Sequence, residues 1–182
     1  MTDFLTMRPK GFDYESGLYS LISYINEFYD VRTMSMIEIG SYLGESTKIF
    51  AESFGKVIAI DPFMDNYDPK DPACKGPTFD LVYKRFLENI SPFSNIKHIR
   101  KTSDDAVKDF VYNSIDFVYI DGIHTYNQVL KDIKNYSPLV KQAYFIAGHD
   151  YKPNWPQVVK AVTECFPKVD KVFEDFSWIK RL

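Results

Sequence analysis

The sequence predicts an α/β fold in three layers, with a mostly parallel sheet between two layers of helices. Three observations predict it. Apolar runs of strand length alternate with segments whose apolar residues recur every three or four positions. A short turn containing Gly40 and Gly44 joins the first strong strand to a helix, as in βαβ units. Residues 171–182 read as two short strands joined tightly, so a terminal hairpin closes the sheet.

The first helix is predicted from the spacing of apolar residues between Glu15 and Tyr29, within an N-terminal helical segment of residues 1–33. We expect it to pack on one face of the sheet, although some of its residues could instead line a substrate entrance. Ser103 or Asp104 is expected to cap a later helix at 106–112. Strands are predicted at 36–39, 57–60, 96–100, 115–120 and 143–147, and the other helices at 46–54, 79–90, 126–136 and 156–166.

A long irregular segment separates the second strand from the next helix. Residues 62–77 contain four prolines, one glycine and several charged residues, without periodicity. Loops of this length inside compact domains are often functional, so 62–77 is a candidate lid over a bound ligand. A surface loop without such a role fits the sequence equally well.

Length and composition limit the function classes. At 182 residues, with 45% hydrophobic and 26% charged residues, the chain has the size and composition of one globular domain. Its net charge of −3 gives no basic footprint for nucleic acid. No apolar run reaches the roughly 20 residues of a membrane span, and the N-terminus lacks the apolar core of a signal peptide. Cys74 and Cys165 lack the spacing of a zinc site or disulfide framework, so we expect a cytoplasmic protein with reduced thiols.

The first candidate site lies between the first strand and Asp61. The strand ends at Gly40, a turn leads to Gly44, and a helix and a second strand follow. Such a unit places backbone N–H groups and a helix N-terminus at the carboxyl edge of a parallel sheet, where nucleotide-like ligands bind. Asp61 ends the second strand 21 residues after Gly40, the spacing at which a carboxylate accepts both hydroxyl protons of a ribose.

The glycine spacing selects among nucleotide-like ligands. The dinucleotide fingerprint needs glycines two and then three positions apart, which Gly40 and Gly44 do not provide, so a nicotinamide or flavin cofactor is disfavoured. The pattern Glu38-x-Gly40-x-x-x-Gly44 with Asp61 resembles motifs I and II of class I S-adenosylmethionine-dependent methyltransferases.

Two further segments extend the resemblance over roughly residues 34–165. The stretch 115–132 contains Ile-Asp-Gly-Ile-His-Thr-Tyr, and 147–151 reads Ala-Gly-His-Asp-Tyr. Both look like segments of a small-molecule O-methyltransferase group that includes relatives of sugar O-methyltransferases from antibiotic pathways. The resemblance implies a Rossmann-like, seven-stranded sheet of order 3-2-1-4-5-7-6 in one methyltransferase domain spanning 1–182. Gln142–Ala143 replaces a glycine pair that is common in relatives, which we expect to change only a turn.

Carried over residue by residue, the resemblance implies a binding site for S-adenosylmethionine at the carboxyl edge of the first three strands. Asp61 would bind the ribose and Phe63 would lie near the adenine. The methionine portion would be surrounded by Glu38, Gly40, Ser41 and Gly44, and the adenine edge would meet Ser103 and Asp104.

Two later strand ends carry more polar groups than a structural sheet needs. Asp121 and His124 follow one strand, and His149 and Asp150 follow the other. We expect these strands to be neighbours, so that the four side chains converge on one crevice at the same edge as the glycine turn. Alternatively, the two acids cap helices or turns and His124 hydrogen-bonds across the sheet edge. The remaining histidine, His98, is expected to be structural.

Two mechanisms fit these residues, and the sequence favours the first. In metal-dependent relatives, acids after the fourth and fifth strands bind a magnesium ion that holds two substrate hydroxyls, and Asp121 and Asp150 take these positions here. His149 stands where some relatives have a second acid, and imidazole is a softer ligand than magnesium prefers. In the metal-free mechanism, His124 or His149 accepts the acceptor's proton, oriented by a neighbouring carboxylate.

The sequence therefore predicts S-adenosylmethionine-dependent O-methylation of a small hydroxylated acceptor such as a sugar or polyol, with Asp121, His124 and His149 as catalytic residues. Because the chain is short for the class, the 62–77 loop, the first helix or a partner subunit must enclose the acceptor, which hints at a homo-oligomer. No nucleic-acid or membrane partner is predicted. The alternatives are a nicotinamide-dependent oxidoreductase and a non-catalytic cofactor-binding module.

Overall fold

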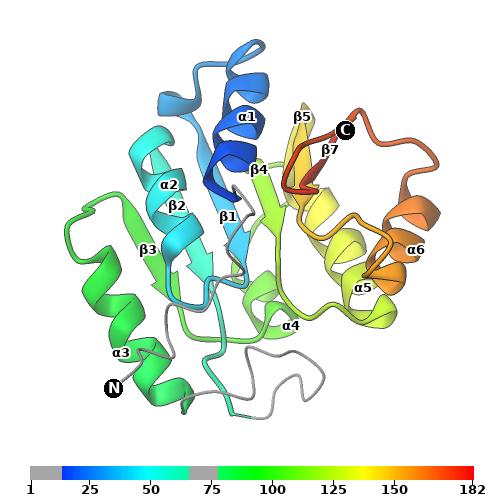
Figure 1. The fold of residues 1–182 in the computed structure, drawn as a ribbon. Helices are drawn as coiled ribbons and strands as arrows, with labels where there is room; N and C mark the ends of the chain where they lie inside the picture. The colour runs from blue at the N-terminus through cyan, green and yellow to red at the C-terminus, as the bar shows by residue number, and fades with distance from the viewer. Residues whose placement is uncertain (1–13, 66–77) are drawn as a thin grey trace.

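The structure is a computed structural model that describes residues 14–65 and 78–182. Within these residues, seven strands form one sheet in the order β3-β2-β1-β4-β5-β7-β6 (Figure 1). The strands from β3 to β5 pair in parallel, whereas β7 runs antiparallel to β5 and β6. The predicted sheet order and terminal hairpin are confirmed. The strands are β1 Ser35–Ile39, β2 Lys56–Ile60, β3 Ile96–Ile99, β4 Ile115–Ile120, β5 Val140–Gly148, β6 Lys171–Val172 and β7 Trp178–Arg181.

Helices cover both faces of the sheet (Figure 1). The α-helices are α1 Tyr14–Asn26, α2 Glu45–Ser53, α3 Phe79–Ile90, α4 Ser103–Ala106, α5 Tyr126–Tyr136 and α6 Pro156–Cys165, and the short 3-10 helices are η2 Val31–Thr33, η4 Val107–Asp109 and η5 Ser137–Leu139. Among the helices of residues 14–65 and 78–182, none is long and apolar enough to cross a membrane.

Alternation along the central strands explains why both faces are covered. In β1, Met36 belongs to the core with α1 and α2, while Ile37 faces the core with α5 and α6. Helix α3 packs over Ala59 on the same face as α1 and α2. Since β1 and β4 are buried on both sides, their sequences read as nearly continuous apolar runs.

The helix predicted at 106–112 is wrong in both its bounds and its cap. Thr102 is the N-cap, because its side chain accepts the N–H of Asp105, and α4 begins directly at Ser103. The chain continues as η4 and becomes extended at Phe110, which packs against the core beneath α5 and α6. The helical segment therefore ends at Asp109, earlier than apolar spacing suggested, and the partly buried Phe110 side chain packs on the core in an extended conformation.

Strand β5 is longer than predicted and contains an irregularity. It begins at Val140, and Ala143 within it has a φ of +69°, a left-handed conformation that side chains rarely adopt. The register with β4 shifts between Ile115 and Phe117. The expectation that Gln142–Ala143 affects only a turn is therefore wrong, since this pair lies inside the strand.

Candidate active site

The turn between β1 and α2 is built so that only glycine fits at its start. Gly40 has a φ of +86°, and a Cβ atom there would lie 2.0 Å from the backbone oxygen of Asp121. Gly44, with a φ of +79°, is the N-cap of α2, and its N–H donates to the carbonyl of Ser41 at 2.7 Å. The turn therefore lies directly against the end of β4, and the first turn of α2 begins immediately after it.

Glu38 attaches α2 to β1 through a fully buried carboxylate. The hydroxyls of Ser46 and Thr47, in the first turn of α2, each donate to it at 2.5 Å. Burial raises the pKa of Glu38 to about 7, although these hydrogen bonds favour the charged form. The predicted cofactor residue Glu38 thus lies beneath the glycine turn and fixes the helix N-terminus there.

Asp61, at the end of β2, organises the same turn from the other side. Its Oδ2 accepts the N–H groups of Ser41 and Tyr42 at 3.1 and 3.0 Å, and its Oδ1 accepts the N–H of Phe63 at 2.8 Å. Burial raises the pKa of Asp61, and the three backbone N–H groups partly offset this effect. Asp61 therefore connects the turns that follow β1 and β2, with both carboxylate oxygens already hydrogen-bonded.

The other predicted adenine residues have clear structural partners. The Phe63 ring is buried against Tyr83 and Phe86 of α3, with ring centroids 4.8 and 5.0 Å away. Ser103 accepts a hydrogen bond from Gln128 of α5, while Asp104 pairs with Lys131 of α5 at 2.6 Å. The structure thus places Phe63 beside Asp61, and it directs Ser103 and Asp104 toward α5. His98, expected to be structural, hydrogen-bonds the Tyr83 hydroxyl at 3.0 Å.

The polar ends of β4 and β5 lie side by side, as predicted. The strands are parallel neighbours, and the His149 N–H donates to the carbonyl of Ile120 at 3.0 Å. His124 Nε2 lies 2.8 Å from Asp150 Oδ2, and Asp121 Oδ1 lies 3.7 Å from both His124 Nε2 and His149 Nδ1. Asp121, His124, His149 and Asp150 therefore form one cluster, which we call the carboxylate–imidazole cluster.

Contacts within the cluster shift the pKa values of His149 and Asp150 in opposite directions. Burial lowers the pKa of His149, but the carboxylates of Asp121 and Asp150 outweigh burial, and the net shift is upward. Burial alone would raise the pKa of Asp150, whereas hydrogen bonds from His124 and His149 and a contact with Lys152 hold it far below its usual range. Asp150 is thus a firmly ionised carboxylate that can orient both imidazoles.

Three contacts to this cluster were not predicted from the sequence. Lys152 Nζ lies 2.6 Å from Asp150 Oδ1, the Trp155 ring stacks on His124 at a centroid distance of 4.3 Å, and Asp175 Oδ2 lies 3.9 Å from His149 Nε2. Asp175 is fully buried between β6 and β7 and accepts hydrogen bonds from Ser177. Lys152 and Trp155 follow the His-Asp-Tyr segment closely in the sequence. This position was the one feature from which their contacts could have been predicted.

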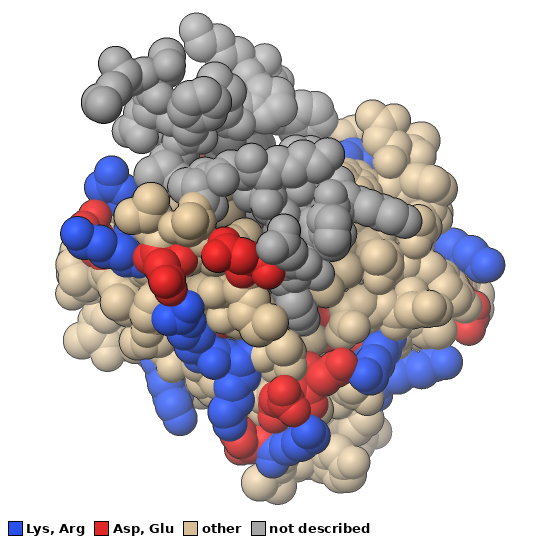
Figure 2. All heavy atoms as spheres, turned by 90° about the horizontal axis from the view of Figure 1, so that it is seen from below, with Lys and Arg blue, Asp and Glu red and all other residues tan. Residues whose placement is uncertain are grey.

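The two halves of the site meet at a backbone contact. The missing Cβ of Gly40 is what lets the turn lie against Asp121, so the glycine turn and the cluster are neighbours on one edge of the sheet. Figure 2 views the lower end of Figure 1, where the parallel strands have their carboxyl ends. The described part of this face shows acidic and basic side chains interspersed. Only 62–65 of the predicted lid, 62–77, lie within the described residues.

A family model described as a methyltransferase domain matches residues 37–151, from β1 to the turn after β5. The chain belongs to this methyltransferase family. A curated relative, the uncharacterized protein R132 of Acanthamoeba polyphaga mimivirus, is 25% identical over 154 residues, which are 80% of this chain. The match spans 65% of that relative's length.

Two solved structures share the fold of this methyltransferase. A putative caffeoyl-CoA O-methyltransferase from Staphylococcus aureus has a TM-score of 0.60 and 16% identity, covering 91% of this chain and 82% of that one. Phosphoethanolamine N-methyltransferase 1 from Haemonchus contortus, in complex with phosphoethanolamine and S-adenosylhomocysteine, has a TM-score of 0.54 and 14% identity, covering 78% of this chain and 27% of that one. Because one of these proteins is named for oxygen and the other for nitrogen methylation, the fold does not identify the acceptor.

The residues at the predicted magnesium site of this methyltransferase offer a mixed set of donor atoms. Ligand atoms of Asp121, His124 and Asp150 all lie within 4.8 Å of one another, a spacing that suits a metal ion. However, Mg²⁺ prefers oxygen ligands in near-octahedral geometry. One of the three ligands is an imidazole, and the Asp150 carboxylate already forms an ion pair with Lys152. The described residues therefore fit magnesium poorly.

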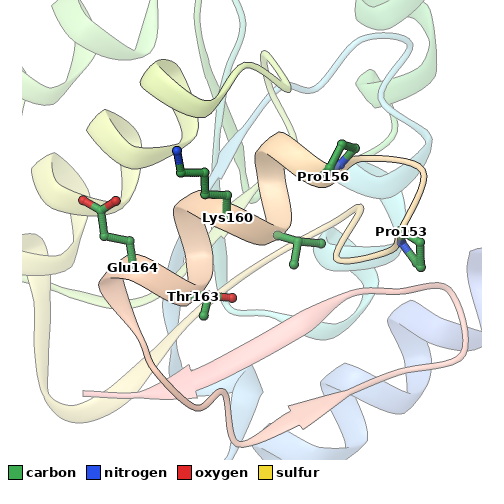
Figure 3. A pocket seen from close by; sticks show the side chains of 6 residues that line it. Pro153, Pro156, Lys160, Thr163 and Glu164 are labelled. Atoms are coloured by element: carbon green, nitrogen blue, oxygen red, sulfur yellow. The ribbon is translucent and has the colours of Figure 1, made fainter.

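A separate pocket lies on the outer surface of α6 (Figure 3). It has a volume of about 440 Å³ and is lined by Pro153, Pro156, Val159, Lys160, Thr163 and Glu164. None of these is a predicted site residue. The glycine turn and the cluster, rather than this pocket, contain the groups that can perform chemistry.

Proposed function

We propose that this chain catalyses S-adenosylmethionine-dependent O-methylation of a small hydroxylated acceptor such as a sugar or polyol. The observation that carries the proposal is the contact between the two halves of the site. The turn at Gly40, whose form suits a nucleotide-like ligand, lies against the backbone of Asp121, the first residue of the cluster. Membership of a methyltransferase family supplies the reaction class, and it disfavours the nicotinamide-dependent alternative.

The cofactor is proposed to bind at the glycine turn. Asp61 holds the backbone of Ser41 and Tyr42 in place, and Glu38 holds the start of α2. When bound, the sulfonium supplies a methyl group that forms a carbon–oxygen bond as its carbon–sulfur bond breaks. Fixing the reactants in line is worth up to about 7–11 kcal/mol in reactions of this kind, so a rigid turn contributes directly to rate.

Asp121 is the member of the cluster best placed to meet the acceptor. Its side chain is 20% exposed, against 14% for His124 and 8% for Asp150. We therefore assign Asp121 to receive the hydrogen bond of the acceptor hydroxyl, with His124 and His149 behind it. His124 or His149 accepts the proton that leaves the hydroxyl, and Asp150 orients the two imidazoles.

The magnesium-assisted version stays a prediction. In that version, Asp121 and Asp150 would hold the ion, which would lower the pKa of the acceptor hydroxyl as a Lewis acid does. The pairing of Asp150 with Lys152 and the imidazole of His149 in place of a second acid favour the metal-free version.

The experiment is methyl transfer from labelled S-adenosylmethionine to a panel of sugars and polyols, using wild type, Asp121→Asn and His98→Asn. We expect one acceptor to be methylated by wild type and His98→Asn, and Asp121→Asn to be slower by about a hundredfold or more. Full activity of Asp121→Asn would contradict the catalytic assignment. A protein that binds the cofactor and methylates no hydroxyl in the panel would favour the non-catalytic module.

A further inference from the structure

Lys152 places a positive charge on one of the two carboxylates that the metal-dependent mechanism would use. Its ammonium nitrogen lies 2.6 Å from Asp150 Oδ1, while Asp150 Oδ2 lies 2.8 Å from His124 Nε2. Both oxygens of this carboxylate therefore already face a nitrogen group. An ion at the usual magnesium–oxygen distance of about 2.1 Å from Oδ1 would lie within about 5 Å of the ammonium. Two cations that close would repel each other strongly in a half-buried site.

The local backbone and packing hold Lys152 in this position. Asp150 has a left-handed φ of +59°, and the Lys152 N–H donates to the Asp150 carbonyl at 2.8 Å, so the chain folds back on itself. The ammonium also lies 5.5 Å from the centre of the Phe176 ring, in the turn between β6 and β7. That turn is attached to the same segment, because the Tyr151 N–H donates to the Phe176 carbonyl at 3.0 Å.

We infer that the ammonium of Lys152 replaces the divalent cation in this methyltransferase, so that the site supports methyl transfer without a metal ion. This inference rests on the proposed function for its catalytic meaning. The ammonium of Lys152 pairs with Asp150 and adds a positive charge to the cluster in which the acceptor oxygen becomes negative. A lysine is suited to this role because its ammonium is a compact charge with three donors on a flexible stem.

The first test measures metal binding directly, without any acceptor. Manganese binding is followed by electron paramagnetic resonance for wild type, Lys152→Ala and Lys160→Ala. Lys160, an exposed residue on α6, controls for the change in net charge. We expect no saturable binding to wild type or Lys160→Ala, and binding at least about tenfold tighter to Lys152→Ala, because Asp150 Oδ1 then no longer pairs with an ammonium. Adding Asp121→Asn to Lys152→Ala should abolish the gained site.

A second variant keeps the test decisive if Lys152→Ala folds poorly. Lys152→Met removes the charge but keeps the stem against the Phe176 ring, and it should bind manganese as Lys152→Ala does. Tight manganese binding by wild type that neither substitution changes would overturn the inference, as would failure of both folded variants to bind the ion.

The second test uses the acceptor found in the panel. Wild-type methyl transfer should be unchanged by a chelator, whereas Lys152→Ala should be slower by about tenfold or more and regain rate on addition of manganese. Loss of wild-type activity on chelation would contradict the inference. Failure of the proposed function is distinguishable, because no hydroxyl in the panel would then be methylated, while the manganese results need no acceptor.

Discussion

The two halves of the candidate site are built from different parts of the chain. At the ends of β1 and β2, the structure is made by backbone: Gly40 turns the chain, and Asp61 collects three backbone N–H groups. At the ends of β4 and β5, it is made by side chains: imidazoles, carboxylates and one ammonium face each other, as at Asp150. On the proposed function, the first half would hold the cofactor, and the second would move or stabilise charge.

This difference predicts which substitutions affect binding and which affect chemistry. Changes in the backbone-built half should impair stability and cofactor affinity together, since the residues proposed to bind the cofactor also hold the turn in place. Changes in the cluster should alter turnover and leave cofactor affinity nearly intact.

Gly40→Ala should have the largest effect. The new Cβ would lie 2.0 Å from the Asp121 backbone oxygen, and the φ of +86° is itself unfavourable for alanine. We expect a loss of about 3 kcal/mol or more in unfolding free energy, measured by denaturant titration, and no detectable cofactor binding. Gly122→Ala is the control, because its Cβ would meet only Ile39 at an ordinary 3.4 Å. Equal stability of the two variants would refute the close-packed turn.

Asp61→Asn should lower both the stability of the protein and its affinity for the cofactor. The amide nitrogen would face backbone N–H groups, so we expect a loss of about 2 kcal/mol and at least about tenfold weaker binding of S-adenosylhomocysteine. Asp116→Asn is a matched control, since Asp116 is also buried and accepts a backbone N–H, from Ser35, at the opposite edge of the sheet. It should lose stability and keep cofactor affinity. Equal loss of affinity in both variants would contradict a local role for Asp61.

The backbone-built half was the more predictable from sequence. The places of Gly40, Gly44 and Asp61 could be predicted from their spacing and from the ends of the strands. Turns and the carboxyl edge of a parallel sheet depend on residues close together in the sequence. The convergence of Asp121 with Asp150 was predictable for the same reason. The sheet order came from the resemblance and is confirmed, whereas the short helix after β3 was misjudged because core burial overrode apolar spacing.

The side-chain pairings were not predictable to the same degree. Asp175 reaches His149 from the terminal hairpin, a contact that depends on how β6 and β7 are placed on β5. The contact of Lys152 with Asp150 depends on a left-handed residue that carries no glycine signal. Nothing in the sequence indicated that the Phe63 ring would be buried under α3.

Stability should fall as pH rises through the titration of Glu38. Its folded-state pKa of about 7 lies above the ordinary glutamate value of 4.5, so the folded protein binds more protons between these pH values. The unfolding free energy should drop by roughly 3 kcal/mol from this group as pH rises from about 4.5 to 7. Asp132, whose pKa burial raises to about 6, acts in the same direction.

Glu38→Gln isolates the contribution of Glu38 to this pH dependence. Denaturant titrations of wild type and variant across this pH range give the difference between the two curves, from which the Asp132 contribution cancels. The variant should lose less stability toward pH 7 than wild type. Parallel curves would show that Glu38 is ionised in the folded protein throughout.

His124→Gln should have the smallest effect on folding and cofactor binding. His124 belongs to the cluster, where Asp121, Asp150 and Trp155 are among its neighbours. We expect S-adenosylhomocysteine affinity within about threefold of wild type, and methyl transfer slower by about a hundredfold. Calorimetry and the labelled-methyl assay give the two numbers. A large loss of cofactor affinity would contradict the prediction that the cluster and the glycine turn have separate roles.

The most direct test of the central claim is calorimetric titration of the folded protein with S-adenosylhomocysteine, in parallel with Asp61→Asn and Asp116→Asn. We predict micromolar binding to wild type and Asp116→Asn, and much weaker binding to Asp61→Asn. No binding by a folded wild-type protein would contradict the assignment of the glycine turn to S-adenosylmethionine.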